Sequence, residues 1–208
     1  MTSAHTSLIA YSGIPDADFA TASDPDERFL ETFTITGAAD DVRHLAESGT
    51  HVAHCPTTAL KVAYGVTQVG RFPDMAARGI NVGIGTDGNN ASNYADMMRA
   101  TYLVAGLFKD ARRDPTIFPA EQAYEMATLG GARAMGLADQ IGSLEPGKKA
   151  DLVLHDTDRP EWRPLLNVAN QLVWSADGRG VHTVFVDGRC VVENYRCTLV
   201  DEERLYAE

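Results

Sequence analysis

Residues 79–90 have the sequence GINVGIGTDGNN. Its first part, from Ile80 to Ile84, is a mostly apolar run of the length of one buried β-strand. The glycines that follow it, together with Asp87, are typical of the loop that leaves a strand. The stretch therefore predicts a buried strand over residues 80–85 whose carboxyl end presents a single carboxylate.

Helical patterns and a second strand surround this stretch. Residues 50–55 form another apolar segment, which Pro56 ends, and residues 38–48 and 72–79 have helical spacing. Acidic residues, a proline and glycines mark the ends of these two helices. A longer helix is expected over residues 94–113. The order helix, strand, helix, strand, helix with short connections predicts a parallel α/β unit.

From about residue 141 the pattern changes to a small antiparallel β element. A strand is predicted at Leu152–Leu154, and Asp187-Gly188 is a strong signal for a two-residue hairpin turn. The chain is thereby divided into an irregular N-terminal segment at residues 1–37 with a short helix at 25–33, an α/β part at residues 38–140, and a β element with a terminal helix at residues 141–208.

The charge balance of the chain narrows its class of partner. Eighteen basic and 29 acidic residues give a formal net charge of −11, which repels nucleic-acid phosphates and anionic lipid. No apolar run is long enough to cross a bilayer, and the N-terminus lacks the features of a secretory signal. Three cysteines without metal-type spacing are typical of a reducing compartment. We therefore expect a cytoplasmic protein with no nucleic-acid or membrane partner.

Asp87 is the first candidate for chemistry. In parallel α/β proteins, binding and catalytic groups gather at the carboxyl ends of the strands. An aspartate at this place, flanked by Gly85 and Gly88, suits a metal ligand or a general base. An aspartate in such a loop equally often caps a helix or orders the turn. The local sequence leaves both interpretations open.

The same glycines also spell the GxGxxG fingerprint of dinucleotide-binding proteins, at Gly83, Gly85 and Gly88. The fingerprint requires its glycines in a turn that opens directly into a helix. Gly83 instead lies within the predicted strand, and residues 89–93 separate the turn from the next helix. An acidic residue in the turn would also repel a pyrophosphate. A nucleotide-binding domain is therefore the minor alternative.

His51 and His54 lie on the neighbouring predicted strand. Residues three apart on a strand point to opposite sides of the sheet, so these two histidines are not expected to bind one metal. His54 is nearer the carboxyl end and is the one that could reach a site. The alternative is a hydrogen-bonded histidine in the core or at its rim.

Together these stretches resemble the amidohydrolase superfamily, in its cytosine-deaminase, aminohydrolase and chlorohydrolase branch. The resemblance is carried by residues 45–65, 75–99, 121–156 and 181–194, and its most specific part is IGSLEPGKKADLVL. It implies the C-terminal portion of a (β/α)8 TIM barrel plus part of a small β-sandwich domain. Residues 50–55 and 80–85 would be the seventh and eighth barrel strands.

The resemblance also implies an activity and a site. Such enzymes are metal-dependent hydrolases that break a carbon–nitrogen or carbon–chlorine bond of a small heterocyclic substrate. Asp87 would bind Zn²⁺ or Fe²⁺ and accept a proton from the metal-bound water, whose pKa the ion lowers toward about 7. His54 would line the substrate pocket, and Asn90 and Ser92 would contact the substrate.

The sequence departs from the family pattern at the other metal ligands. It contains no His-x-His, and TFTITGAA at residues 32–39 has no histidine where the family has one on the sixth strand. A catalytic zinc normally has three protein ligands, so one carboxylate does not hold it. We therefore expect a truncated C-terminal half of a longer enzyme, with a non-catalytic interaction or scaffold fragment as the alternative. Strand edges left unpaired by an incomplete barrel favour self-association into a homo-oligomer.

Overall fold

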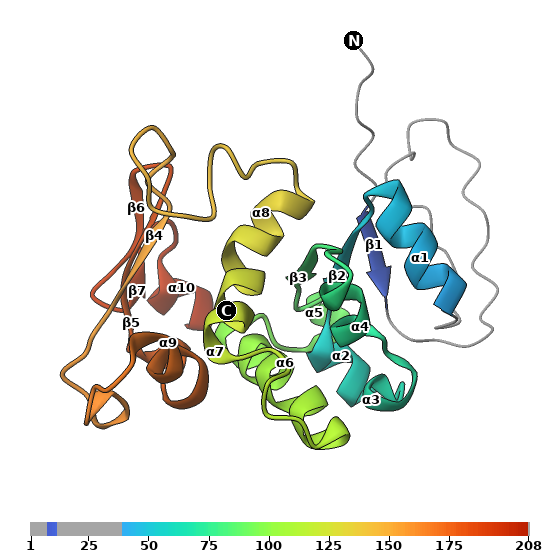
Figure 1. Cartoon of the computed structure of the whole chain (residues 1–208). Helices are drawn as coiled ribbons and strands as arrows, with labels where there is room; N and C mark the ends of the chain where they lie inside the picture. Colours follow the sequence, from blue (N-terminus) through green and yellow to red (C-terminus); the bar gives the residue numbers. More distant parts are fainter. Residues whose placement is uncertain (1–7, 12–38, 208) are drawn as a thin grey trace, which may run out of the picture.

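The computed structural model describes residues 8–11 and 39–207, and in these residues two β-sheets are joined by helices (Figure 1). The first sheet is parallel, in the order β1 (Leu8–Tyr11), β2 (His51–His54) and β3 (Val82–Ile84). The second sheet is antiparallel, in the order β4 (Leu152–His155), β5 (Val181–Val186), β6 (Arg189–Glu193) and β7 (Arg196–Cys197).

Helices accompany the first sheet and separate it from the second (Figure 1). Those around the first sheet are α1 (Ala39–Ser48), α2 (Pro56–Lys61), α3 (Val66–Val69), α4 (Phe72–Ala77), α5 (Asn89–Ser92) and α6 (Met97–Arg112). A continuous helical run follows, made of α7 (Ala120–Glu125), the π-helical η1 (Met126–Gly130) and α8 (Gly131–Ala134). Near the second sheet lie η2 (Pro160–Trp162), α9 (Val168–Asn170), η3 (Gln171–Ser175), η4 (Gly178–Gly180) and α10 (Glu202–Ala207). Across the described residues, no helix combines the length and apolar character that a membrane crossing requires.

The predicted parallel α/β unit is confirmed. β2 and β3 pair in parallel, with Val52 opposite Val82 and His54 opposite Ile84. The intervening helix α4 ends just before Gly79, whose φ of +79° is the left-handed conformation that commonly stops a helix. The local stop signal in the sequence therefore marks the true end of this helix.

The prediction of an irregular N-terminal segment is wrong for Leu8–Tyr11, which form β1 and pair in parallel with β2. The physical reason is that LIAY is a short apolar run with strand-favouring Ile and Tyr. Without it, β2 would present an open row of backbone groups along that edge. The helix predicted at residues 25–33 lies outside the described residues.

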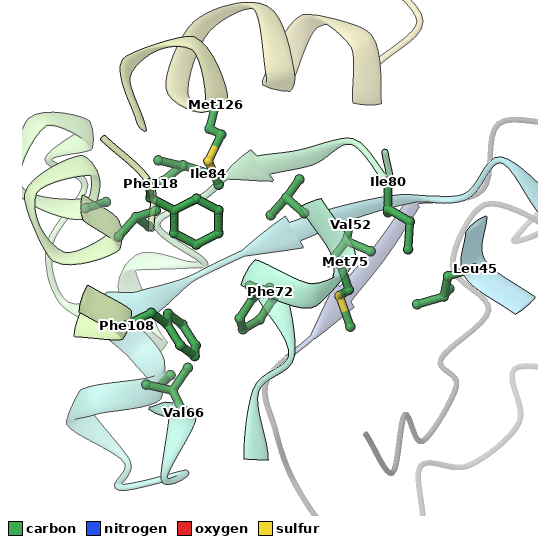
Figure 2. Close-up of a cluster of buried hydrophobic side chains, with 14 of the residues drawn as sticks. Leu45, Val52, Val66, Phe72, Met75, Ile80, Ile84, Phe108, Phe118 and Met126 are labelled. Atoms are coloured by element: carbon green, nitrogen blue, oxygen red, sulfur yellow. The ribbon is translucent and has the colours of Figure 1, made fainter. Parts of the chain in front are cut away.

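The main core lies between the parallel sheet and helices α1, α4 and α6 (Figure 2). Val52 and Val82 project from the sheet into it, and Phe72, Met75 and Phe108 enter it from the helices with no exposed surface. Each such side chain contributes roughly 1.5–3 kcal/mol by leaving water. Residues of β2 and β3 that share the face of Val52 therefore belong to this core.

The free edge of β3 is covered by the helical run η1–α8 rather than by a strand. A Cβ placed on Gly83 would lie 3.4 Å from backbone atoms of Gly130 and Gly131. The Asn81 side-chain Nδ2 donates a hydrogen bond to the Gly130 carbonyl at 2.9 Å. Glycines on both sides permit this close backbone approach. The helix thus protects an edge that would otherwise be open to another strand.

The C-terminal β element follows the sequence closely. β5 and β6 form the predicted hairpin, and Asp187 and Gly188 at its turn have φ of +51° and +76°, as a type I′ turn requires. Residue 140, near which the domain boundary was predicted, lies in the loop between Ala134 and Leu152. The boundary itself remains a prediction.

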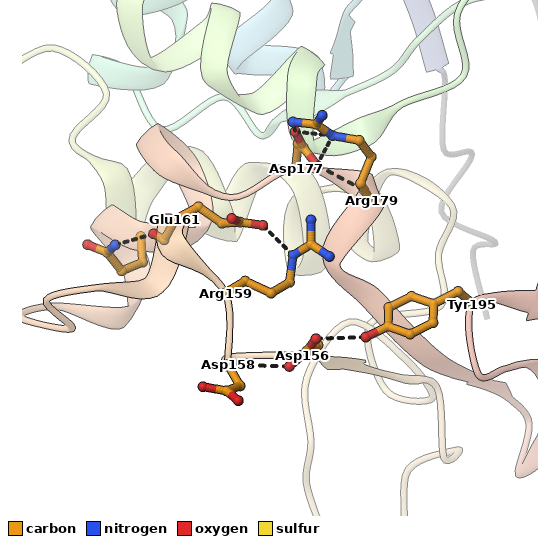
Figure 3. Close-up of polar contacts among 8 residues, drawn as sticks. Asp156, Asp158, Arg159, Glu161, Asp177, Arg179 and Tyr195 are labelled. Atoms are coloured by element: carbon orange, nitrogen blue, oxygen red, sulfur yellow. Dashed lines mark hydrogen bonds and ion pairs between the residues drawn. The ribbon is translucent and has the colours of Figure 1, made fainter.

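Polar contacts hold the segments beside this second sheet (Figure 3). Arg159 Nε donates to Glu161 Oε1 at 2.6 Å, and the Tyr195 hydroxyl donates to Asp156 Oδ2 at 2.7 Å. Arg159 lies on the loop after β4, whereas Tyr195 lies between β6 and β7. The loop after β4 is therefore hydrogen-bonded both to η2 and to the turn between β6 and β7.

Candidate functional site

Asp87 lies in the loop after β3, at the carboxyl end of the parallel strands, with its side chain exposed. Its φ of +62° is a left-handed conformation that aspartate tolerates better than most residues. Its Oδ1 accepts the Gly88 backbone N–H at 2.6 Å. The carboxylate is therefore locally ordered while it stays open to solvent, as a ligand or proton acceptor must be.

Cys55, one residue beyond β2, lies beside Asp87. Its sulfur lies 2.9 Å from where a Cβ on Gly85 would stand. Burial raises the pKa of the Cys55 thiol to about 11, and the Asp87 carboxylate acts in the same direction. The thiol is therefore neutral at pH 7 and is not a nucleophile.

The sequence analysis did not identify Cys55 as a neighbour of Asp87. The signal that could have found it is register. His54 is opposite Ile84, so the next residues of the two parallel strands, Cys55 and Gly85, leave the sheet together.

His54 is the last residue of β2, but its side chain is buried in the core rather than open beside Asp87. Its side chain is 1% exposed and stacks on Phe72, with ring centroids 3.8 Å apart, and it meets the edge of Phe108. Burial lowers the pKa of His54 to about 3, so the imidazole is neutral. Nε2 has no hydrogen-bond partner among the described residues. Strand alternation puts His54 on the core face with Val52. That His54 lines a substrate pocket remains a prediction.

The loop after Asp87 contains the other two expected substrate contacts. Asn90 is exposed on α5, and its Oδ1 lies over Gly88, 2.6 Å from where a Cβ on that glycine would stand. Ser92 is buried, and its hydroxyl is engaged with the backbone carbonyls of Gly88 and Tyr94. Asn90 is thus open to a ligand next to Asp87, whereas Ser92 closes the turn.

A metal ion at Asp87 would need further donor atoms close to that carboxylate. Among residues 40–207, no three side chains of His, Cys, Asp or Glu come together in a group that could hold a metal ion. Asp87 has only the neutral thiol of Cys55 beside it in the tips of β2 and β3. A catalytic zinc needs three protein ligands. The described residues therefore do not fit a complete metal centre.

Two hollows lie elsewhere on the molecule. One, of about 340 Å³, lies at the amino end of β3 near Asn81, Glu125 and Arg133. The other, of about 1020 Å³, runs between α6 and the second sheet and is lined by Tyr102, Val153 and other residues. Asp87 lines neither of them. The carboxylate thus stands on an open edge.

The glycines of the GxGxxG pattern do not form a phosphate cradle. Gly83 is buried inside β3 against the helical run η1–α8. α5 begins only at Asn89, and its N-cap residue Gly88 donates its N–H to Asp87. The turn thus points an acidic side chain at the place where a pyrophosphate would bind, which disfavours the nucleotide-binding alternative.

The fold of the described residues is shared with solved structures that contain zinc. An adenosine deaminase from Xanthomonas campestris, crystallised with zinc, superposes with a TM-score of 0.77. It is 35% identical, over 86% of this chain and 40% of that one. Atrazine chlorohydrolase from Arthrobacter aurescens shares the fold, with a TM-score of 0.76 at 24% identity over 96% of this chain and 39% of that one. The fold is thus a mixed α/β fold that these two structures share.

The chain belongs to the amidohydrolase family, whose model matches residues 26–191. A 5-methylthioadenosine/S-adenosylhomocysteine deaminase of Moorella thermoacetica is 45% identical over 81% of this chain and 39% of its own length. A 5′-deoxyadenosine deaminase of Methanosarcina acetivorans is 38% identical over 81% of this chain and 38% of its own length. The chain thus spans about two fifths of the length of these relatives.

Proposed function

We propose that this chain forms the C-terminal part of a metal-dependent aminohydrolase that removes the amino group from an adenine nucleoside. In this proposal β2 and β3 are the last two strands of a (β/α)8 barrel, and the second sheet is part of a small β-sandwich domain. The observation that carries it is the exposed, locally ordered Asp87 carboxylate at the carboxyl end of β3. Barrel enzymes build their active sites at this end of the strands.

The proposed substrate class comes from the relatives. Their names include 5-methylthioadenosine, S-adenosylhomocysteine and 5′-deoxyadenosine, which share an adenine base on a ribose and differ at the 5′ position. Deamination replaces the ring amino group by oxygen from water. Asp87 would accept a proton from the attacking water, a role that contributes about 10²–10⁴-fold in enzymes. Asn90, exposed on the same loop, would contact the base.

We also propose Asp87 as one ligand of a divalent metal, zinc or iron. The other ligands would come from outside residues 40–207, because this part lacks a set of three. They would lie in a longer form of the protein or in a second chain. The three free cysteines, Cys55, Cys190 and Cys197, support a reducing, cytoplasmic setting for it.

The test is complementation. The 208-residue chain is mixed with the part of the Moorella thermoacetica relative that lies outside the match, and ammonia release from 5-methylthioadenosine and 5′-deoxyadenosine is measured. We expect turnover and bound metal only in the mixture. Asp87→Asn should lower the rate by about 100-fold or more, whereas Asp139→Asn, an exposed aspartate on another loop, should not change it.

Two results would contradict the proposal. Stoichiometric zinc or iron on the 208-residue chain alone would show that it builds a metal site without the missing part. No turnover in a stable, metal-loaded mixture, or turnover that Asp87→Asn does not affect, would instead support the non-catalytic interaction fragment.

A further inference from the structure

Contacts from α2 and the residue before it reach across to the loop that bears Asp87. Thr57 Oγ1 donates a hydrogen bond to the Thr86 carbonyl at 3.3 Å. The sulfur of Cys55 lies against Gly85, 2.9 Å from where a Cβ on that glycine would stand. Both contacts act at the beginning of the loop, directly beside the carboxylate.

Lys61, at the end of α2, holds the far side of the same loop. Its Nζ donates to the Ala91 carbonyl at 2.7 Å and also to Asn93 Oδ1. The Nδ2 of Asn93 in turn donates to the Asn89 carbonyl at 3.3 Å. The amide of Asn93 therefore links the lysine to the first residue of α5.

The α5 turn needs such an external tie. It spans only Asn89–Ser92, and helices this short do not form on their own. Its own backbone bonds are few: Ala91 and Ser92 donate to the Gly88 carbonyl at 2.9 Å, and Asn93 donates to Asn89 at 3.0 Å. All of them depend on the two residues that directly follow Asp87.

We propose that Lys61 is a positioning residue that, through Ala91 and Asn93, holds the α5 turn against α2 and thereby orients Asp87 and Asn90. Thr57 and Lys61 are four residues apart, so one face of α2 reaches both ends of the loop. The consequence for catalysis rests on the proposed function, whereas the positioning itself does not.

The first experiment measures backbone amide hydrogen exchange by NMR on the full chain. Lys61→Met removes the donor but keeps the length of the side chain. Asn93→Gly removes the side-chain amide that links Lys61 to Asn89. Glycine tolerates the φ of +58° at that position. In either variant, exchange at Ser92 should become about tenfold faster. Exchange at Val52 and Gly85, whose N–H groups are bonded within the β2–β3 ladder, should not change.

Three further variants make this experiment decisive. Lys109→Met is the matched control, since Lys109 also donates to a backbone carbonyl, that of Phe118, at 3.0 Å; it should leave Ser92 unchanged. Lys61→Arg keeps a donor and should stay within about twofold of the wild type. The double variant of Lys61 and Asn93 should exchange no faster than Lys61→Met alone, because Lys61 makes the bonds to both Ala91 and Asn93.

The inference fails if Lys61→Met leaves exchange at Ser92 unchanged. It also fails if exchange at Val52 and Gly85 rises equally, which would indicate global destabilisation, or if the effects of the two single changes multiply. In the complemented enzyme, Lys61→Met should lower kcat about tenfold with KM within about twofold. If the wild-type mixture has no turnover, the proposed function fails, but the exchange rates still decide the positioning role.

Discussion

His54 is a neutral imidazole buried among aromatic rings, and its burial makes folding sensitive to pH. Burial lowers the pKa of His54 to about 3, against an ordinary value of about 6.5 in the unfolded chain. Below pH 6.5 the unfolded state binds a proton that the folded state does not. The free energy of unfolding should therefore fall by about 1.4 kcal/mol per pH unit, or about 2 kcal/mol by pH 5. Urea unfolding at pH 7 and at pH 5 measures it.

The control for this prediction is His54→Phe, which keeps a ring against Phe72. In this variant, the number of protons taken up on unfolding between pH 7 and pH 5 should be smaller by close to one. Some dependence should remain, because burial also lowers the pKa of His51 and of His155. An unchanged slope in His54→Phe would show that the imidazole is protonated in the folded protein.

At the scale of the elements, Asp74 joins α4 to α6. It accepts two hydrogen bonds from Arg112 at 2.9 Å each, and one from Arg71 Nε at 2.5 Å. Arg112 is the main reason that the pKa of Asp74 is lowered to about 2. A bidentate ion pair between an arginine and a carboxylate is the strongest form of this interaction. Partial exposure to solvent weakens it.

Asp74→Asn should lower the free energy of unfolding by about 1–2 kcal/mol at pH 7. Because the folded pKa lies below the unfolded value of about 3.9, this stabilisation is present above pH 4 and is lost as the pH falls toward 2. The difference between wild type and variant, measured by thermal unfolding, should shrink over that range. Arg112→Met should produce a similar loss, and the double variant no more than either; additive losses would contradict the pairing.

The elements themselves were predictable to different degrees. The helix at α6 and the hairpin at Asp187 were read from periodicity and turn chemistry within a few residues of sequence. The short helices α2 and α5 were not, because turns of four to six residues carry little periodicity. Their ends are set by contacts with each other, such as the bond from Lys61 to Ala91.

At the scale of the whole molecule, the second sheet ends in β4, with Val153 and Leu154 each 48% exposed. An apolar edge strand of this kind favours pairing with another chain. We expect the 208-residue chain to self-associate as its concentration rises, as measured by sedimentation velocity. Leu154→Lys should reduce that association, whereas Leu166→Lys, on a loop residue that is 86% exposed, should not. Equal effects of both changes would point to general hydrophobic association instead.

The position of Asp87 at a strand end could be predicted, because an apolar run followed by glycines is a local pattern. Its neighbours could not. His54 and Cys55 are adjacent in sequence, yet one is buried among aromatic rings and the other meets Asp87, because alternate strand residues face opposite sides. Which of the two faces became the core was decided by where the helices packed.

Strands β2 and β3, the long helix, the hairpin and the carboxylate at the end of β3 could all be predicted from the sequence, since each depends on residues close together in the chain. Only the tertiary structure decided what surrounds that carboxylate. The contact from Lys61 to Ala91 joins residues 30 apart, and that from Asn81 to Gly130 joins residues 49 apart. Such contacts depend on how the packed elements lie against each other, and no local pattern encodes them.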